Sequence, residues 1–113
     1  MSVAAIDPVI FSEISALMDD SLPIFIETYM ENTQKLLAKL EQAVPAGDSE
    51  VVFQNVHQLK GGSGSIGAMQ VFQIAKQIED VIKGGDGEGQ LGGLFAELKS
   101  AYVAAEAELK TLL

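Results

Sequence analysis

The residues best suited to chemistry lie in one short segment, residues 56–68. It contains the only histidine of the chain, His57, followed by Lys60 and by a run of glycines. A neutral imidazole nitrogen is a competent nucleophile near neutral pH, and a lysine ammonium one helical turn away offsets negative charge that arrives there. The segment lacks a general base, a metal cluster and a nucleotide site. It could therefore accept a phosphoryl group and pass it on, but could not generate one.

The helical position of His57 decides how accessible its ring is. At about 100° per residue, one stripe of the helix is apolar and faces the core: Val52, Val56 and Leu59. His57 lies well outside this stripe, with Lys60, Gly61 and Gly64 on its side. A glycine destabilises a helix by about 1 kcal/mol relative to alanine. Two glycines beside an exposed imidazole therefore indicate that a large partner approaches the ring closely. The alternative is an ordinary exposed histidine followed by an interhelical turn.

Three of the glycines, Gly62, Gly64 and Gly67, also fit the G-x-G-x-x-G spacing of dinucleotide-binding loops. That loop needs a preceding strand, so that a helix N-terminus meets the pyrophosphate. Here the preceding residues have helical spacing, and Ala68 stands where a Walker A loop has lysine. We therefore predict no nucleotide or other cofactor. With no cysteine and one histidine, we also predict no metal site.

The overall composition restricts the partners further. The 113 residues include 16 Asp and Glu but only 7 basic residues, all lysine, for a net charge of −9. An acidic chain without arginine is poorly suited to nucleic acid or to an anionic membrane. The chain shows no N-terminal signal layout and no run of about 18 apolar residues, so we expect no membrane insertion and a cytoplasmic location.

The spacing of apolar residues predicts helices almost throughout the chain and no strand. Asp7 and Pro8 have the residue types that begin a helix, and they open a short first one. A second, long helix starts near Pro23 and ends at residues 45–47, where proline and glycine interrupt it.

Asp48 can cap a third helix, and the glycines at 61–67 weaken the chain before a fourth. Residues 84–93 form a glycine-rich connection, and the last helix spans about 94–112. The sequence therefore predicts one all-α domain, residues 1–113. Its expected architecture is an antiparallel four-helix bundle with a short N-terminal capping helix.

Residues 57–68 read HQLKGGSGSIGA and resemble the signature H-x-L-K-G-x-S-x-x-x-G-A of histidine-containing phosphotransfer (HPt) domains. The likeness extends outward from the opening residues 6–8 to the helix after His57, and so covers essentially the whole chain. It implies a four-helix bundle in which His57 carries a phosphoryl group between receiver-domain aspartates in a two-component phosphorelay. It also implies that Lys60 assists the phosphoryl group and that Gly61 clears room for the receiver.

From this likeness we expect a monomeric phosphoryl carrier without an ATP site, whose partners are response-regulator receiver domains. Such a domain occurs alone in the cytoplasm or as the cytosolic end of a membrane-bound hybrid histidine kinase. A pseudo-HPt module, which binds a partner without transferring phosphate, is an alternative.

Residues 60–64, KGGSG, also resemble the phosphoacceptor domain of chemotaxis histidine kinases, which gives a second alternative. Glu79, 22 residues after His57, falls where that related domain has a carboxylate oriented toward the histidine. A carboxylate in contact with a ring N–H would fix the tautomer of the imidazole. The other interpretation of Glu79 is a solvated charge on a helix surface.

Overall fold

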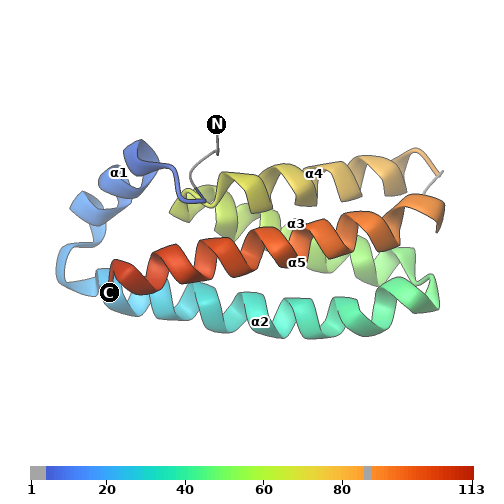
Figure 1. The fold of residues 1–113 in the computed structure, drawn as a ribbon, viewed down its shortest axis with the longest axis horizontal. Coiled ribbons are helices and arrows are strands. Elements are labelled where there is room, and N and C mark those ends of the chain that lie inside the picture. Colours follow the sequence, from blue (N-terminus) through green and yellow to red (C-terminus); the bar gives the residue numbers. More distant parts are fainter. Residues whose placement is uncertain (1–4, 86–87) are drawn as a thin grey trace.

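The computed structural model describes residues 5–85 and 88–113, and this part of the chain contains five α-helices and no strand. The helices are α1 Pro8–Met18, α2 Leu22–Ala46, α3 Ser49–Ile66, α4 Met69–Lys83 and α5 Glu88–Thr111, with a 3₁₀ turn, Asp19–Ser21, between the first two. The four longer helices run antiparallel and form a closed ring, in which each packs against two neighbours (Figure 1). The shorter α1 lies across one end, against α2 and α3. The predicted all-α four-helix bundle with an N-terminal capping helix is confirmed.

Local sequence signals explain where α1 and α3 begin and where α2 and α3 end. The side chains of Asp7 and Asp48 accept hydrogen bonds from first-turn backbone N–H groups of α1 and α3. Gly47 and Gly67 follow α2 and α3 in the left-handed conformation, with φ of +69° and +89°. Glycine adopts this conformation without steric cost, so both positions suit the chain reversals on either side of α3.

The core is mainly apolar, and a buried pair of hydroxyl groups ties α3 to α2. Almost completely buried leucine and isoleucine side chains come from all four long helices: Ile26, Leu40, Leu59, Ile66, Ile78, Leu98 and Leu109. Among them, the Tyr29 hydroxyl and Ser63 Oγ form a buried hydrogen bond of 2.7 Å. A buried hydroxyl without a partner is costly, so this pair favours one register of α3 against α2.

The last helix begins earlier than the sequence predicts. α5 starts at Glu88 rather than near residue 94, and Gly89, Gly92 and Gly93 are helical. Leu91 and Phe95 are buried in the core, and this burial offsets the helical cost of the neighbouring glycines. Of the predicted glycine-rich connection, only residues 84–85 are described as a turn; residues 86–87 lie outside the described part.

α3 likewise continues through glycines that were expected to weaken it. Gly61, Gly62 and Gly64 are all helical, and the helix ends only at Gly67. The reason is tertiary, because Ser63 and Ile66 are fully buried and hold the last turns of α3 against the bundle. The interpretation of these glycines as an interhelical turn is therefore wrong.

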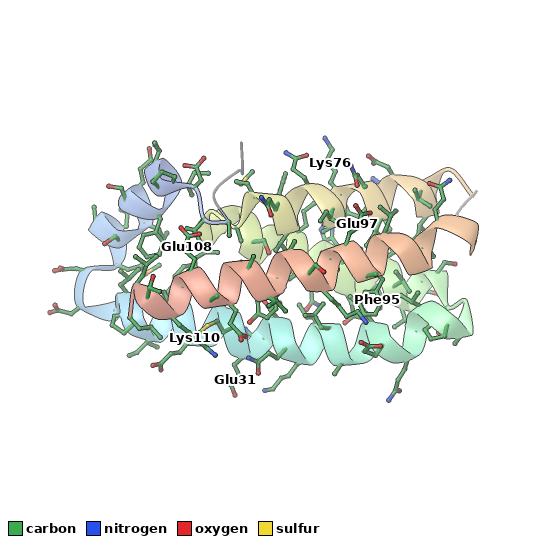
Figure 2. The ribbon with its side chains drawn as sticks, viewed as in Figure 1. Glu31, Lys76, Phe95, Glu97, Glu108 and Lys110 are labelled. Carbon is green, nitrogen blue, oxygen red and sulfur yellow. The ribbon has the colours of Figure 1, made fainter. Side chains whose placement is uncertain are left out.

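Charged side chains cover the outside of the bundle. Figure 2 shows Glu31 on α2 and Lys76 on α4 pointing away from it on opposite sides, and both are exposed. Among the described helices, none combines the length and the apolar character needed to cross a membrane.

Candidate functional site

His57 lies on the outer face of α3, as the helical spacing predicts. Its neighbours Val56 and Leu59 are almost fully buried, whereas 63% of the His57 side chain is exposed. The imidazole is thus anchored on a rigid, packed helix while its ring stands in solvent. A nucleophile held on a packed element keeps a defined direction of attack.

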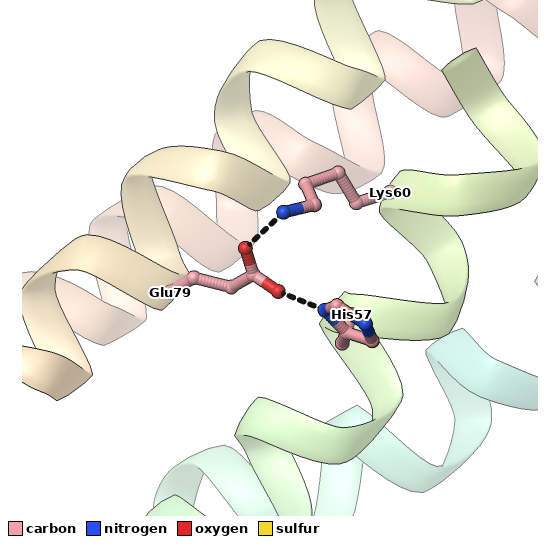
Figure 3. A network of polar contacts seen from close by, with 3 residues as sticks. All are labelled: His57, Lys60 and Glu79. Carbon is pink, nitrogen blue, oxygen red and sulfur yellow. Dashed lines mark hydrogen bonds and ion pairs between the residues drawn. The ribbon is translucent and has the colours of Figure 1, made fainter.

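Glu79, on α4, joins His57 and Lys60 in one polar network (Figure 3). Its Oε2 lies 2.7 Å from His57 Nδ1, and its Oε1 lies 2.6 Å from Lys60 Nζ. Only 3% of the Glu79 side chain is exposed. The interpretation of Glu79 as a solvated helix charge is therefore wrong.

Burial by itself would raise the pKa of the Glu79 carboxyl. The hydrogen bonds and positive charges of Lys60 and His57 outweigh burial and hold that pKa below its ordinary value. Glu79 is accordingly ionised at neutral pH and can only accept hydrogen bonds. His57 Nδ1 must then carry the proton and donate it to Glu79. In the neutral ring this leaves the lone pair on Nε2 as the nucleophile.

The lowered pKa of Glu79 predicts pH-dependent stability. Because the unfolded chain binds this proton more readily than the folded chain, the free energy of unfolding increases with pH across the range between the two pKa values. The contribution of Glu79 is fully present above the ordinary carboxyl pKa of 4.5 and is lost as the pH falls through the lower folded-state pKa.

The variant Glu79→Gln tests this linkage. We expect the wild type to lose its stability advantage over Glu79→Gln as the pH is lowered from about 6 to about 3, measured by urea unfolding at each pH. The remaining carboxyls titrate in both proteins, so the difference isolates Glu79. An advantage that stays constant over this range would contradict the assigned ionisation of Glu79.

Lys60 is more enclosed than its surface position on the helix indicates. Its side chain is 25% exposed, and its ammonium contacts Glu79 rather than projecting freely into solvent. The ammonium and the imidazole therefore bind the two oxygens of one carboxylate. This arrangement keeps a positive charge near the ring through a shared carboxylate.

The glycines of α3 have different surroundings. Apart from its chain neighbours and the backbone of its own helix, a Cβ built on Gly61 would meet no atom of the described residues within 4 Å, so the space beside His57 is open. A Cβ on Gly64 would lie 3.2 Å from the Phe72 ring of α4, so close helix packing accounts for this glycine. Gly61 thus stands beside free space on the His57 side, whereas a docking role for Gly64 stays a prediction.

Phe53 is the contact of His57 that the sequence analysis missed. Its ring is nearly parallel to the imidazole, at 7°, with the centroids 6.1 Å apart. The available signal was the spacing of four residues, which places two side chains on the same face of a helix.

A groove runs between α2 and α3, on the side of α3 that faces away from α4, and reaches Gln58, next to His57. Apolar side chains, including Phe25 and Leu36, form part of its lining. The lysines Lys35 and Lys39 add positive charge to its edge, in a chain that is otherwise strongly acidic.

Comparisons with known proteins agree with this fold. The chain is 30% identical to histidine-containing phosphotransfer protein 4 of Arabidopsis thaliana over 106 residues, which cover 88% of this chain and 83% of that protein. It is also 30% identical to histidine-containing phosphotransfer protein 2 of Arabidopsis thaliana over 86 residues, or 70% of this chain and 55% of that protein.

A solved structure matches the bundle closely. The crystal structure of histidine-containing phosphotransfer protein B from Pseudomonas aeruginosa PAO1 superposes with a TM-score of 0.91 and 22% sequence identity, over 97% of this chain and 95% of that chain. The model of the Hpt domain family matches residues 25–112, a range that contains His57, Lys60 and Glu79. The chain therefore belongs to the Hpt domain family, the histidine phosphotransfer domains that act as phosphocarriers in phosphorelays.

Proposed function

We propose that His57 is the phosphoacceptor of this Hpt domain and that Nε2 is the attacking atom. The observation that supports it best is the pairing of an exposed imidazole with a buried carboxylate. Glu79 holds Nδ1, so the other ring nitrogen is the one that can face a partner. Lys60 supplies the nearby positive charge, and Gly61 leaves the space beside the ring open.

Transfer from a receiver then has a simple bond balance. The Nε2 lone pair attacks the phosphorus of an aspartyl phosphate, the P–N bond forms, and the P–O bond to the receiver carboxylate breaks. Nδ1 keeps its proton, and the Glu79 carboxylate offsets the positive charge that the ring gains. The reverse of the same steps passes the group to the next aspartate.

The docking face that fits this reaction contains His57, Gly61 and the neighbouring groove between α2 and α3. Its apolar lining can bury surface on a receiver, and the positive charge of Lys35 and Lys39 suits an approaching partner that carries a phosphorylated aspartate. We further propose that residues 1–113 act as one monomeric, cytoplasmic domain without an ATP site, either free or within a hybrid kinase.

Incubation with a radiolabelled, phosphorylated receiver tests the proposal. We expect label to move to this chain and to be acid-labile and base-stable, as a phosphoramidate is. A chain that binds the receiver without taking up label would instead be a pseudo-HPt module. The contact between Glu79 and His57 resembles the one expected in chemotaxis-type acceptor domains, so a chemotaxis kinase core is the informative second phosphate donor. Labelling by that kinase core and not by the receiver would contradict a receiver as the donor.

Lys60 should accelerate transfer without being essential. Its ammonium is partly screened by solvent, so its attraction for the phosphoryl group amounts to about 1 kcal/mol, or about fivefold in rate. We expect Lys60→Ala to slow labelling by this factor, measured as the initial rate with a phosphorylated receiver.

Lys99→Ala provides a matched control, because Lys99 also bridges two helices, through Glu41 at 2.9 Å, but on the α2–α5 side of the bundle. This control should label at the wild-type rate. Loss of labelling as complete as in a His57 variant would show that Lys60 does more than compensate charge.

A further inference from the structure

The ring of Phe53 is placed against the imidazole by the helix itself. Phe53 precedes His57 by one turn on α3, and residues four apart lie on the same helical face. Their nearly parallel rings, 6.1 Å apart at the centroids, have the separation at which aromatic pairs attract one another. Phe53 is half-buried, and Lys83 Nζ of α4 lies 5.6 Å from the centroid of its ring.

The hydrogen bond to Glu79 does not by itself fix the plane of the imidazole. It holds Nδ1 near Oε2 of Glu79, but the torsion that turns a histidine ring is broad. The ring can therefore turn about its Cβ–Cγ bond through the range over which Nδ1 stays within hydrogen-bond reach of Oε2. A parallel ring on one side opposes that rotation, because turning the imidazole out of the parallel arrangement would lose the favourable contact between the two rings.

The plane matters because the Nε2 lone pair lies in it. Phosphoryl transfer depends mainly on aligning the attacking atom, the phosphorus and the leaving oxygen. We propose that Phe53 is a positioning residue for phosphotransfer: its ring fixes the plane of the His57 imidazole, and with it the direction of the Nε2 lone pair. This inference rests on the proposed role of His57 as phosphoacceptor.

Lys83 supports Phe53 in this role. A lysine ammonium within about 6 Å of a ring centroid is attracted to the face of the ring. Since α3 and α4 are packed neighbours, Lys83 holds Phe53 from the helix that also supplies Glu79. The imidazole is thus oriented by two contacts that both depend on α4, one direct and one through Phe53.

The variant Phe53→Leu keeps an apolar side chain and removes the planar ring. We expect labelling to slow by about two- to tenfold with a phosphorylated receiver, and by the same factor with phosphoramidate, a small donor that needs no docking. Phe53→Tyr, which keeps the ring, should restore both rates. Lys83→Met should slow both by less than Phe53→Leu.

A spectroscopic readout separates positioning from a general structural effect. In the wild type, the proton resonances of the His57 ring should show the ring-current shift of a stacked neighbour. This shift should disappear in Phe53→Leu and persist in Phe53→Tyr, while Nδ1 stays protonated. Phe72→Leu is the matched control, because Phe72 is a half-buried phenylalanine that packs near Gly64 of α3; it should leave the shift and both rates unchanged.

Three outcomes would overturn the proposal: unchanged rates with both donors in Phe53→Leu, a loss in this variant that is confined to the receiver, or an equal loss in Phe72→Leu. The first would show that the ring plane does not limit transfer, and the second that Phe53 contributes to docking. A wild-type chain that accepts no label on His57 would overturn the proposed function itself and this inference with it.

Discussion

His57→Gln should abolish phosphate uptake while leaving the bundle folded. The variant lacks the only imidazole of the chain, and a glutamine amide is not a nucleophile toward phosphorus. The fold should survive because most of the side chain is exposed and a glutamine N–H can still donate to Glu79. Labelling with a phosphorylated receiver and with phosphoramidate, together with thermal unfolding by circular dichroism, measures both expectations.

The unfolding curve is the control for this variant. A midpoint close to that of the wild type shows that lost labelling reflects the missing nucleophile rather than a lost fold. Label retained by His57→Gln would place the phosphoacceptor on another residue and contradict the assignment.

Gly61→Gln should cause the second-largest loss of phosphate transfer, and only when the donor is a phosphorylated receiver. Gly61 lies one turn beyond His57 on the exposed face, so a long side chain there would extend over the imidazole. We expect transfer from a phosphorylated receiver to fall by about tenfold or more, because displacement of the receiver disturbs the alignment of the reacting atoms. Phosphoramidate needs far less room, so its rate should change little. Gly61→Glu should impair the receiver further, through repulsion of the phosphoryl oxygens.

The fold should tolerate these substitutions, because a side chain at Gly61 meets no described atom at its Cβ position. Gly61→Ala should even stabilise the chain by up to about 1 kcal/mol, since the position is helical. Gly92→Gln is a matched control: Gly92 is a helical, exposed glycine on α5 with equally open surroundings among the described residues. Equal losses with both donors would show that Gly61 serves the shape of the backbone and not the clearance of the receiver.

The sequence was sufficient to predict the bundle because its apolar residues recur at helical spacing in every long helix. It was insufficient at the start of α5. There, Gly89, Gly92 and Gly93 have low helix propensity, and the burial of Leu91 and Phe95 against other helices overrides it. A contribution that comes from packing with distant segments is not visible in local propensity.

In the site, too, features that depend on a single helix could be predicted from the sequence, whereas contacts between helices could not be predicted from spacing. The exposure of His57 follows from its own helix, because the apolar stripe through Val56 and Leu59 fixes which way the ring points. The burial of Glu79 also had a signal, since it follows the buried Ala75 by four residues. The resemblance to chemotaxis-type acceptor domains indicated His57 as a partner of Glu79, but spacing alone could predict neither His57 nor Lys60, because both contacts depend on how α4 is placed against α3.

The most direct test of the account is to locate the phosphorus atom in the phosphorylated wild-type chain. With a single histidine in the sequence, a long-range proton–nitrogen NMR spectrum reports on His57 alone. We predict a phosphorus–nitrogen coupling at Nε2 and a proton on Nδ1, where Glu79 accepts it. Phosphorus on Nδ1, or on a side chain other than His57, would contradict the account.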